Sequence, residues 1–229
     1  MKILIIAATR FEVRPLADKF AYVQKEDESL AHYQYRNDKV DILITGVGMT
    51  PTAYYLGMQL PASNYDLVIN AGICGSYSDS LPVGTVVNVT EECFCELGAE
   101  NNDQLIPLFE LGLMDPDEPP YRGGKLLNNS TPKGSVLRGL RRVRGITSNT
   151  IHGHPETIRR IREQFNPDVE SMEGAAFFFA CLTSGVPFHQ VRAISNFVEE
   201  RDKSKWNIPL ALANLNSTLF DAIKEQSNK

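Results

Sequence analysis

The chain has 229 residues, 42% of them hydrophobic, and 23 Lys and Arg against 28 Asp and Glu give a formal net charge of −5. This composition excludes intrinsic disorder, a collagenous chain and a disulfide-stapled scaffold, and the length fits one α/β domain with a large core. An acidic chain would repel a phosphate backbone, and the apolar runs are far shorter than the roughly 18 residues that cross a bilayer. We therefore expect no nucleic-acid partner and no membrane partner.

The first residues and the cysteines predict a cytoplasmic location. Arg10, Glu12 and Arg14 interrupt the apolar run that a signal peptide would need. The four cysteines show no CxxC spacing. We expect them to be reduced and mostly buried thiols.

The first half of the chain predicts a parallel α/β arrangement. Residues 2–8 form an apolar run rich in Ile, typical of a strand covered on both faces, and residues 40–45 and 67–71 repeat this character. Residues 51–60 begin with a proline and have the spacing of a crossover helix, which predicts a βαβ unit. Residues 83–89 predict a further strand after the turn residues Pro82 and Gly84.

Turn residues dominate the segment 91–142, which we interpret as a long excursion from the sheet. A short strand is then predicted over 144–147, helices over 155–165 and 172–184, and a strand over 188–194. Asn207 with Pro209 predicts an N-cap and first turn of a last helix that ends near residue 224. The alternation of strands and helices predicts a single α/β domain over residues 1–229 with a mainly parallel sheet.

Ligands of open α/β sheets bind beyond the carboxyl ends of the strands. Four segments at such places carry glycine or polar residues: 9–12, 46–48, 70–76 and 193–196. The glycine loops match neither a Walker A loop nor GxGxxG, so nucleotide triphosphate chemistry is disfavoured, and glycines there can simply serve tight turns. His152 and His154 lack the spacing of a metal site and are expected to be turn histidines at the surface.

Two carboxylates, Glu170 and Glu173, precede an apolar helix. Acidic residues at a helix start favour the helix dipole, which is a structural explanation for both. However, Gly174 and the alanines and phenylalanines after it predict a helix buried nearly all round. We therefore expect Glu173 to point into a partly enclosed site. Arg192 lies in an apolar strand, and because a buried guanidinium needs an acidic partner, we expect it to pair with a carboxylate from this segment.

In this order the segments resemble the purine nucleoside phosphorylase and nucleosidase superfamily, especially the methylthioadenosine/S-adenosylhomocysteine nucleosidases. The resemblance rests on residues 1–8, Glu12-Val13, Gly46-Val47-Gly48, residues 70–75, Val83-Gly84-Thr85, Met172-Glu173-Gly174-Ala175-Ala176 and residues 191–195. It implies a three-layer α/β/α sandwich with a mixed, mainly parallel central sheet and a small-molecule purine nucleoside as substrate. It implies neither a metal nor an organic cofactor. It also implies a homo-oligomer, with a dimer favoured, in which a neighbouring subunit completes the pocket for the C5′ substituent.

Residues 192–196 with Glu199, Arg201-Asp202 and Trp206-Asn207-Ile208-Pro209 are similar to one branch of this superfamily. That branch acts in menaquinone biosynthesis and releases hypoxanthine from a nucleoside whose C5′ chain contains a benzoate. For the C5′ chain we expect a lining from residues 94–113, with Arg10 or His152 near the benzoate.

The resemblance also implies roles for individual residues. Glu12 would activate water, although the chain alone would favour a solvated carboxylate between Arg10 and Arg14. Glu173 would bind the ribose hydroxyls and stabilise the cationic sugar. Other implied substrate-binding residues are Ala71, Gly72, Ile73, Ser171, Met172, Ile151 and His152, and implied structural supports are Arg192 and Asp202.

Asn196 departs from the nucleosidase pattern, which has aspartate at this position. Hypoxanthine presents two acceptors, N7 and O6, and an asparagine amide can donate both of its hydrogens to them, whereas an ionised aspartate would repel O6. Asparagine in place of aspartate therefore predicts a substrate with a 6-oxopurine base. It also removes the usual general acid. We expect Asn196 to stabilise the departing base by hydrogen bonding, with a proton from water, from Asp202 or from no donor.

Two other functions compete with hydrolysis. Phosphorylases of the superfamily hold phosphate with a Gly-Asp-Pro-x-Arg type of loop after the first strand. Here the loop contains Arg10, which could hold an anion, and Glu12, which would repel one. Water is therefore the favoured nucleophile. A binding protein without activity would be favoured by loss of Glu12 or Glu173, and both are present.

Overall fold

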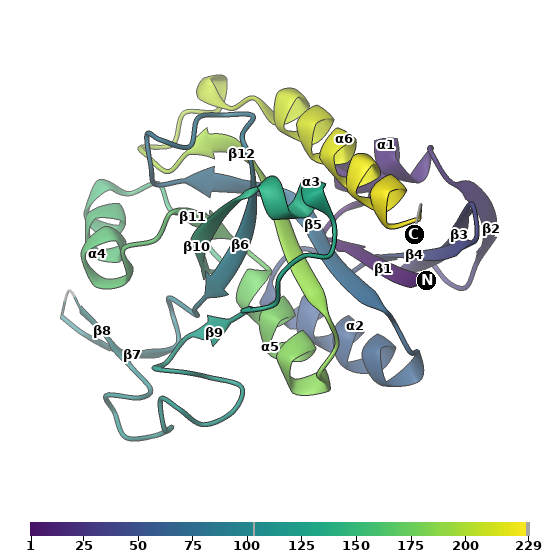
Figure 1. Cartoon of the computed structure of the whole chain (residues 1–229). Coiled ribbons are helices and arrows are strands. Elements are labelled where there is room, and N and C mark those ends of the chain that lie inside the picture. Colours follow the sequence, from purple (N-terminus) through teal and green to yellow (C-terminus); the bar gives the residue numbers. More distant parts are fainter. Residues whose placement is uncertain (103, 228–229) are drawn as a thin grey trace.

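The computed structural model describes residues 1–102 and 104–227. Its elements in chain order are β1 (Lys2–Ala7), α1 (Arg10–Ala17), β2 (Ala21–Lys25), β3 (Leu30–Tyr35), β4 (Asp38–Ile44), α2 (Met49–Ala62), β5 (Leu67–Ser76), β6 (Val86–Glu92), β7 (Gly98–Asn101), β8 (Gln104–Pro107), β9 (Leu126–Leu127), α3 (Ser135–Gly139), β10 (Arg141–Thr147), α4 (Pro155–Phe165), β11 (Val169–Ser171), α5 (Gly174–Ser184), β12 (Phe188–Phe197), the short 3-10 helix η1 (Lys203–Lys205) and α6 (Ile208–Gln226) (Figure 1).

A large mixed sheet runs in the order β11-β10-β6-β12-β5-β1-β4-β3-β2. Its central strands β12, β5, β1 and β4 are parallel, which brings their carboxyl ends to the same edge. β11 also pairs antiparallel with β5, so β5, β12, β6, β10 and β11 form a closed circuit of strand pairings. This closure brings β11 and β12 to the two sides of β5.

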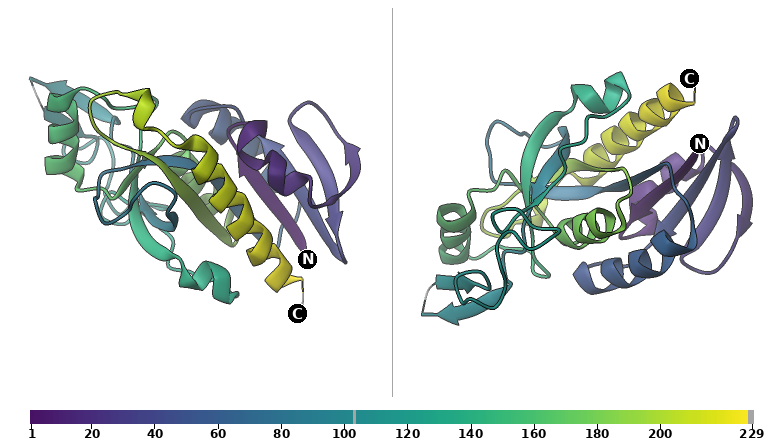
Figure 2. Two further views of the ribbon diagram at one scale, coloured as in Figure 1. Left: turned by 90° about the horizontal axis from the view of Figure 1, so that it is seen from above. Right: turned by 60° about the horizontal axis from the view of Figure 1, so that its bottom comes forward.

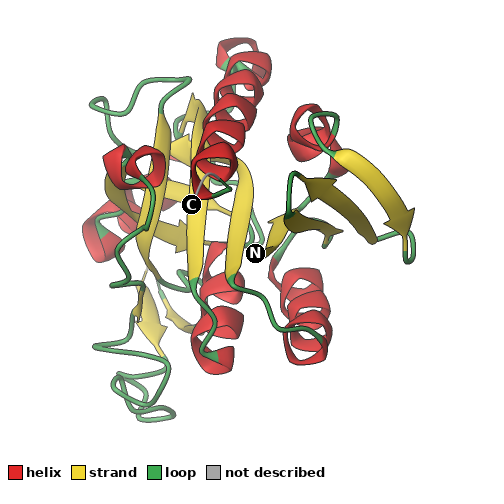
Figure 3. Ribbon diagram, turned by 45° about the vertical axis from the view of Figure 1, so that its right-hand side comes forward, coloured by secondary structure: helices red, strands yellow, loops and turns green. Residues whose placement is uncertain are grey.

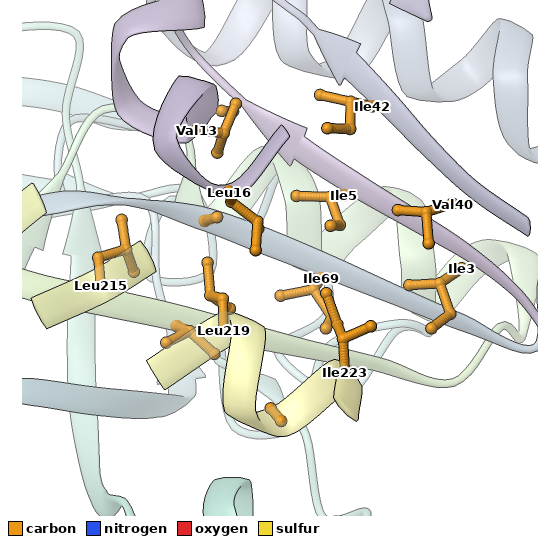
Figure 4. Close-up of a cluster of buried hydrophobic side chains, with 14 of the residues drawn as sticks. Ile3, Ile5, Val13, Leu16, Val40, Ile42, Ile69, Leu215, Leu219 and Ile223 are labelled. Atoms are coloured by element: carbon orange, nitrogen blue, oxygen red, sulfur yellow. The ribbon is translucent and has the colours of Figure 1, made fainter. Parts of the chain in front are cut away.

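Helices cover both faces of the sheet, which confirms the expected three-layer sandwich (Figures 1 and 3). On one face α1 and α6 pack on the central strands, and their Leu16 and Leu219 belong to the same core cluster as Ile5 (Figure 4). On the other face α2 and α5 contribute Leu56 and Phe177 to a second core cluster. Each of these buried side chains stabilises the fold by about 1.5–3 kcal/mol relative to exposure. Within the described residues, no helix combines the length and apolar character that a membrane span requires.

Most predicted strands and helices are present, but tertiary contacts make some of them begin or end at other residues than predicted. The helix predicted over 155–165 has the predicted bounds. The strand predicted from residue 83 begins at Val86, because Gly84 has φ +89° and donates its N–H to the Ile194 carbonyl in a turn. The helix predicted from residue 172 begins at Gly174, because the residues before Met172 pair with β10 as strand β11.

The excursion over residues 91–142 is confirmed as mostly turns, but it contains regular pieces that the sequence did not predict. β7 and β8 form a separate two-stranded hairpin, β9 pairs with β6, and α3 packs near α6. The two views of Figure 2 show this hairpin projecting from the body of the molecule, at the opposite end from β3 and the edge strand β2.

Candidate active site

A cavity of about 260 Å³ lies where β1, β5 and β12 end. The three predicted catalytic residues, Glu12, Glu173 and Asn196, all line it, although they come from different elements. Ile73, Met172 and Ile151, which the resemblance assigned to substrate binding, line it as well. The complete lining is Ala8, Thr9, Phe11, Glu12, Val47, Ile73, Cys74, Gly75, Ile151, Glu170, Met172, Glu173, Ser195, Asn196, Trp206, Ile208 and Leu212.

Glu12 is held by the backbone at the start of α1. Its Oε2 accepts the Thr9 N–H at 2.9 Å and lies 3.1 Å from the Thr9 hydroxyl, and its Oε1 accepts the Ile73 N–H at 3.2 Å. The residue is 7% exposed, so the interpretation as a solvated carboxylate is wrong. All three partners are donors, which suits an ionised carboxylate with acceptor capacity left for a water molecule.

Glu173 and Arg192 form the buried pair that the sequence predicted. Glu173 precedes the first turn of α5, its Oε1 accepts the Gly48 N–H at 3.1 Å, and its Oε2 lies 3.5 Å from Arg192 Nη2. Burial raises the pKa of Glu173, and the Arg192 charge and the Gly48 N–H act against that rise. Among the described side chains, Arg192 Nε is one of three buried polar atoms without a hydrogen-bond partner.

Gly72 makes room for both charged groups. A Cβ at this position would lie 2.0 Å from Arg192 Nη1 and 2.9 Å from Glu12 Oε1. A residue with a side chain would therefore displace the guanidinium and the carboxylate. Of its neighbours, Ile73 reaches the cavity, whereas Ala71 packs in the core beneath it.

Asn196 lies on β12 just after a register shift, and its amide is engaged with its own neighbours. Its Oδ1 lies 2.7 Å from the Ser195 hydroxyl, and its Nδ2 donates to the Phe197 carbonyl at 2.9 Å. The expectation that both amide hydrogens serve the base therefore needs correction. One hydrogen is used within the chain, and one remains for a ligand.

His152 is not the surface histidine that the sequence predicted. Its side chain is 11% exposed, its Nδ1 contacts Glu170 Oε2, and its backbone N–H donates to Glu170 Oε1 at 3.0 Å. Glu170 also accepts the Tyr77 hydroxyl at 2.8 Å and lines the cavity. Glu170 is a site residue that the sequence pattern did not predict. The sequence feature that could have indicated Glu170 is its place two residues before Met172, in a short segment that is buried in the structure. His154, in contrast, is exposed.

The remaining predicted residues lie around the cavity or away from it. Ser171 Oγ accepts the Gly174 N–H at 3.2 Å and so caps the start of α5. Asp202 is exposed and accepts the Ser204 N–H at 2.9 Å, which stabilises η1, and it is not among the lining residues. Arg10 pairs with Glu28 at 3.4 Å beside a different cavity.

Part of the predicted C5′ lining, residues 94–113, lies at a cavity other than the one that holds Glu12. Phe94, Leu97 and residues 107–110 line a second cavity of about 330 Å³. Residue 103 lies outside the described residues, and none of residues 94–102 and 104–113 lines the cavity that holds Glu12. No three His, Cys, Asp or Glu side chains in the described part of the chain are grouped so that they could hold a metal ion.

Comparisons with known proteins agree with this fold. The family model of the phosphorylase superfamily matches residues 2–224, so the chain belongs to that superfamily. It is 32% identical over 188 residues to a futalosine hydrolase of Streptomyces coelicolor, covering 78% of this chain and 76% of the relative. It is 28% identical over 229 residues to a 5′-methylthioadenosine/S-adenosylhomocysteine nucleosidase of Bacillus cereus, covering 96% of each.

A solved structure shows the same fold. The 5′-methylthioadenosine/S-adenosylhomocysteine nucleosidase of Colwellia psychrerythraea in complex with adenine superposes with a TM-score of 0.83. The match covers 98% of this chain and 95% of that one, at 21% identity.

Proposed function

We propose that the chain hydrolyses the N-glycosidic bond of futalosine to hypoxanthine and dehypoxanthinyl futalosine, a step of menaquinone biosynthesis. The similarity to futalosine hydrolases supports this substrate. The observation that carries the proposal is the content of a single cavity, in which two buried carboxylates, Glu12 and Glu173, lie with the amide of Asn196.

The two carboxylates fit the charge that develops on the sugar. Cleavage of an N-glycosidic bond passes through an oxocarbenium-like ribose, so preorganised negative charge beside C1′ lowers the barrier. Glu173 stabilises this cation and accepts the ribose hydroxyls. Glu12, which three donors hold in place, takes a proton from the attacking water.

Asn196 serves the departing base. Its remaining N–H donates to N7 or O6 as negative charge builds on the purine, and the Ser195 contact at 2.7 Å fixes which way the amide faces. An aspartate there would suit the 6-amino group of adenine. The asparagine therefore favours hypoxanthine over the substrates that the nucleosidase relatives are named for.

Water is a better nucleophile for this cavity than phosphate. Among the described residues that line the cavity, none is Lys or Arg. Arg10 binds the Glu28 side chain elsewhere, and Arg192 is already paired with Glu173. A phosphate dianion would meet Glu12 without a compensating cation.

Incubation of the purified chain with futalosine, inosine and methylthioadenosine, with and without phosphate, tests the proposal when the free base is followed by chromatography. We expect hypoxanthine from futalosine at a rate that does not depend on phosphate. Dependence on phosphate would show a phosphorylase. Adenine from methylthioadenosine alone would show the nucleosidase activity, and no free base from any substrate would show a binding protein.

We further propose that the enzyme is a cytoplasmic homodimer. Phe11, Val47 and Ile151 line the cavity and are also exposed, so its rim is apolar and open. α2, which begins two residues after Val47, exposes Tyr54 and Met58, a face that a second copy would bury. Light scattering should give twice the monomer mass, and Tyr54→Glu should give the monomer with a raised KM for futalosine. A monomeric wild type at micromolar concentration would contradict the dimer.

A further inference from the structure

Gly75 separates Glu170 from Asn196 in the floor of the cavity. Its register partner on β11 is Glu170, and its partner on β12 is Asn196. Residues opposite one another in a sheet project to the same side, and two strand spacings place the outer backbones about 10 Å apart. All three residues line the cavity. The floor therefore has a carboxylate on one side, an amide on the other and bare backbone between them.

The missing side chain of Gly75 matters for this space. A Cβ there would lie 2.7 Å from Val198 Cγ2 and 3.4 Å from Asn196 Nδ2. A larger residue would therefore clash with Val198 and crowd the Asn196 amide. With glycine, only backbone lies between the strand positions of Glu170 and Asn196.

Glu170 is held as an acceptor with one site still open. Its Oε2 receives the Tyr77 hydroxyl at 2.8 Å and His152 Nδ1, and its Oε1 receives the His152 N–H at 3.0 Å. Each carboxylate oxygen can accept two hydrogen bonds, so Oε1 can take one more. Glu170 is 5% exposed, and a buried carboxylate gains most from a donor in the remaining position.

The two purine classes present different groups to this pair. A 6-oxopurine offers the acceptors N7 and O6 followed by the donor N1–H. A 6-aminopurine offers the acceptor N7, an amino donor and then the acceptor N1. A base whose N7 side meets the Asn196 N–H turns its N1 side toward Glu170. The lone pair of adenine N1 would then face a carboxylate, whereas the N1–H of hypoxanthine would donate to it.

We propose that Glu170, held by Tyr77 and His152, accepts N1–H of the base and sets the preference of this site for 6-oxopurines. This inference rests on the proposed function, because it takes the cavity to hold the purine. It gives Glu170 a role that Asn196 alone does not supply. A hydrogen bond to a buried charged group changes affinity by about 10- to 100-fold.

Binding of free bases to the full chain tests this by calorimetry, because it needs no turnover. The wild type should bind hypoxanthine about 10- to 100-fold more tightly than 1-methylhypoxanthine, which has no N1–H. In Glu170→Ala the two bases should bind equally. In Glu170→Gln the hypoxanthine-to-adenine preference should fall by at least about tenfold. The matched control is Glu163→Gln, whose exposed carboxylate pairs with Arg159 on α4 outside the cavity lining and whose loss should leave both ratios unchanged.

A purely structural role for Glu170 would weaken all bases alike, and unchanged ratios in Glu170→Gln would overturn the proposal. If the variants do not fold, equal wild-type affinity for hypoxanthine and 1-methylhypoxanthine would overturn it as well. The proposed function fails separately. A wild type that cleaves no nucleoside while its base preference depends on Glu170 would reject hydrolysis and keep the recognition role. A wild type that cleaves futalosine, with affinity ratios that Glu170→Gln leaves unchanged, would keep the hydrolysis and reject the recognition role of Glu170.

Discussion

Arg192 Nη2 lies 3.5 Å from Glu173 Oε2, and the two side chains are only 1% and 8% exposed. Burial favours the neutral form of Glu173, and the guanidinium favours the ionised form that a cationic sugar requires. In the proposed mechanism, the negative charge of Glu173 therefore depends on Arg192, which is not among the residues that line the cavity. Arg192 acts on the reaction through Glu173 as a positioning residue.

Replacing Arg192 with methionine should move the pH dependence of activity. Loss of the cation raises the pKa of Glu173 further. The acidic limb of the pH profile, where Glu173 becomes protonated and activity is lost, should therefore move to higher pH. Breaking a buried pair lowers the unfolding free energy by about 3–5 kcal/mol. We also expect kcat/KM at pH 7 to fall, because less Glu173 is ionised. Arg192→Lys keeps a cation and should move the acidic limb less. Profiles of kcat/KM from pH 5 to 9 check this, and an unmoved limb in Arg192→Met contradicts it.

Gly72→Ala should disrupt the site without adding bulk anywhere else. The new Cβ would lie 2.0 Å from Arg192 Nη1, so the guanidinium must leave its position beside Glu173. We expect a loss of 1–3 kcal/mol in unfolding free energy, roughly that of overpacking, together with at least about tenfold lower activity. Gly139→Ala is the matched control, since nothing lies within 4 Å of a Cβ there. Denaturant unfolding compares them, and equal stability of the two variants would refute the steric account.

Glu92 should make stability depend on pH. This fully buried carboxylate accepts Gln190 Nε2 at 2.6 Å and the Thr147 hydroxyl at 2.9 Å, and burial raises its pKa to about 7. The unfolded chain loses this proton near pH 4.5, so the folded state holds more protons between about pH 4.5 and 7, and stability falls as the pH rises through that window. Glu92→Gln removes this dependence.

Unfolding free energies of wild type and Glu92→Gln at pH 5 and pH 8 measure the effect. Between these two pH values the variant should gain up to about 3 kcal/mol relative to wild type. A difference between the two proteins that is the same at both pH values would show that Glu92 does not titrate in this range.

If Glu12 activates water, as we propose, Glu12→Gln should remove this base. The amide cannot accept a proton from water, and general base catalysis contributes about 10²- to 10⁴-fold, so kcat should fall by that factor. Glu163→Gln, an exposed carboxylate on α4, is the control and should keep full activity. Turnover of futalosine at saturation gives kcat directly. A Glu12→Gln enzyme with wild-type kcat would assign the base to another residue.

Local patterns predicted the central strands and the helix of residues 155–165, because Ile-rich runs and an amphipathic segment after a proline are determined within a few residues. The same reasoning missed α1, which contains Pro15, and β2, whose residues are all exposed and show no alternation. Tertiary pairing holds β2 against β3, and no local signal encodes it.

Within the site, the family resemblance selected Glu12, Glu173 and Asn196, and the cavity brings these three together. Glu170 was not predicted, because its position depends on the pairing of β11 with β5, two strands far apart in the chain. The burial of His152 follows from the same pairing. The segment around His152 has the composition of a polar turn, and nothing in that pattern indicates that the Glu170 carboxylate will bind it.

We propose that this cavity cleaves a 6-oxopurine nucleoside. The ratio of kcat/KM for futalosine to that for the same nucleoside with adenine as its base tests it most directly, measured on wild type and Asn196→Asp together. We predict that wild type favours futalosine at least about 100-fold and that Asn196→Asp lowers this ratio at least about tenfold. A wild type that cleaves the adenine nucleoside equally well, or a ratio that Asn196→Asp leaves unchanged, would contradict the account.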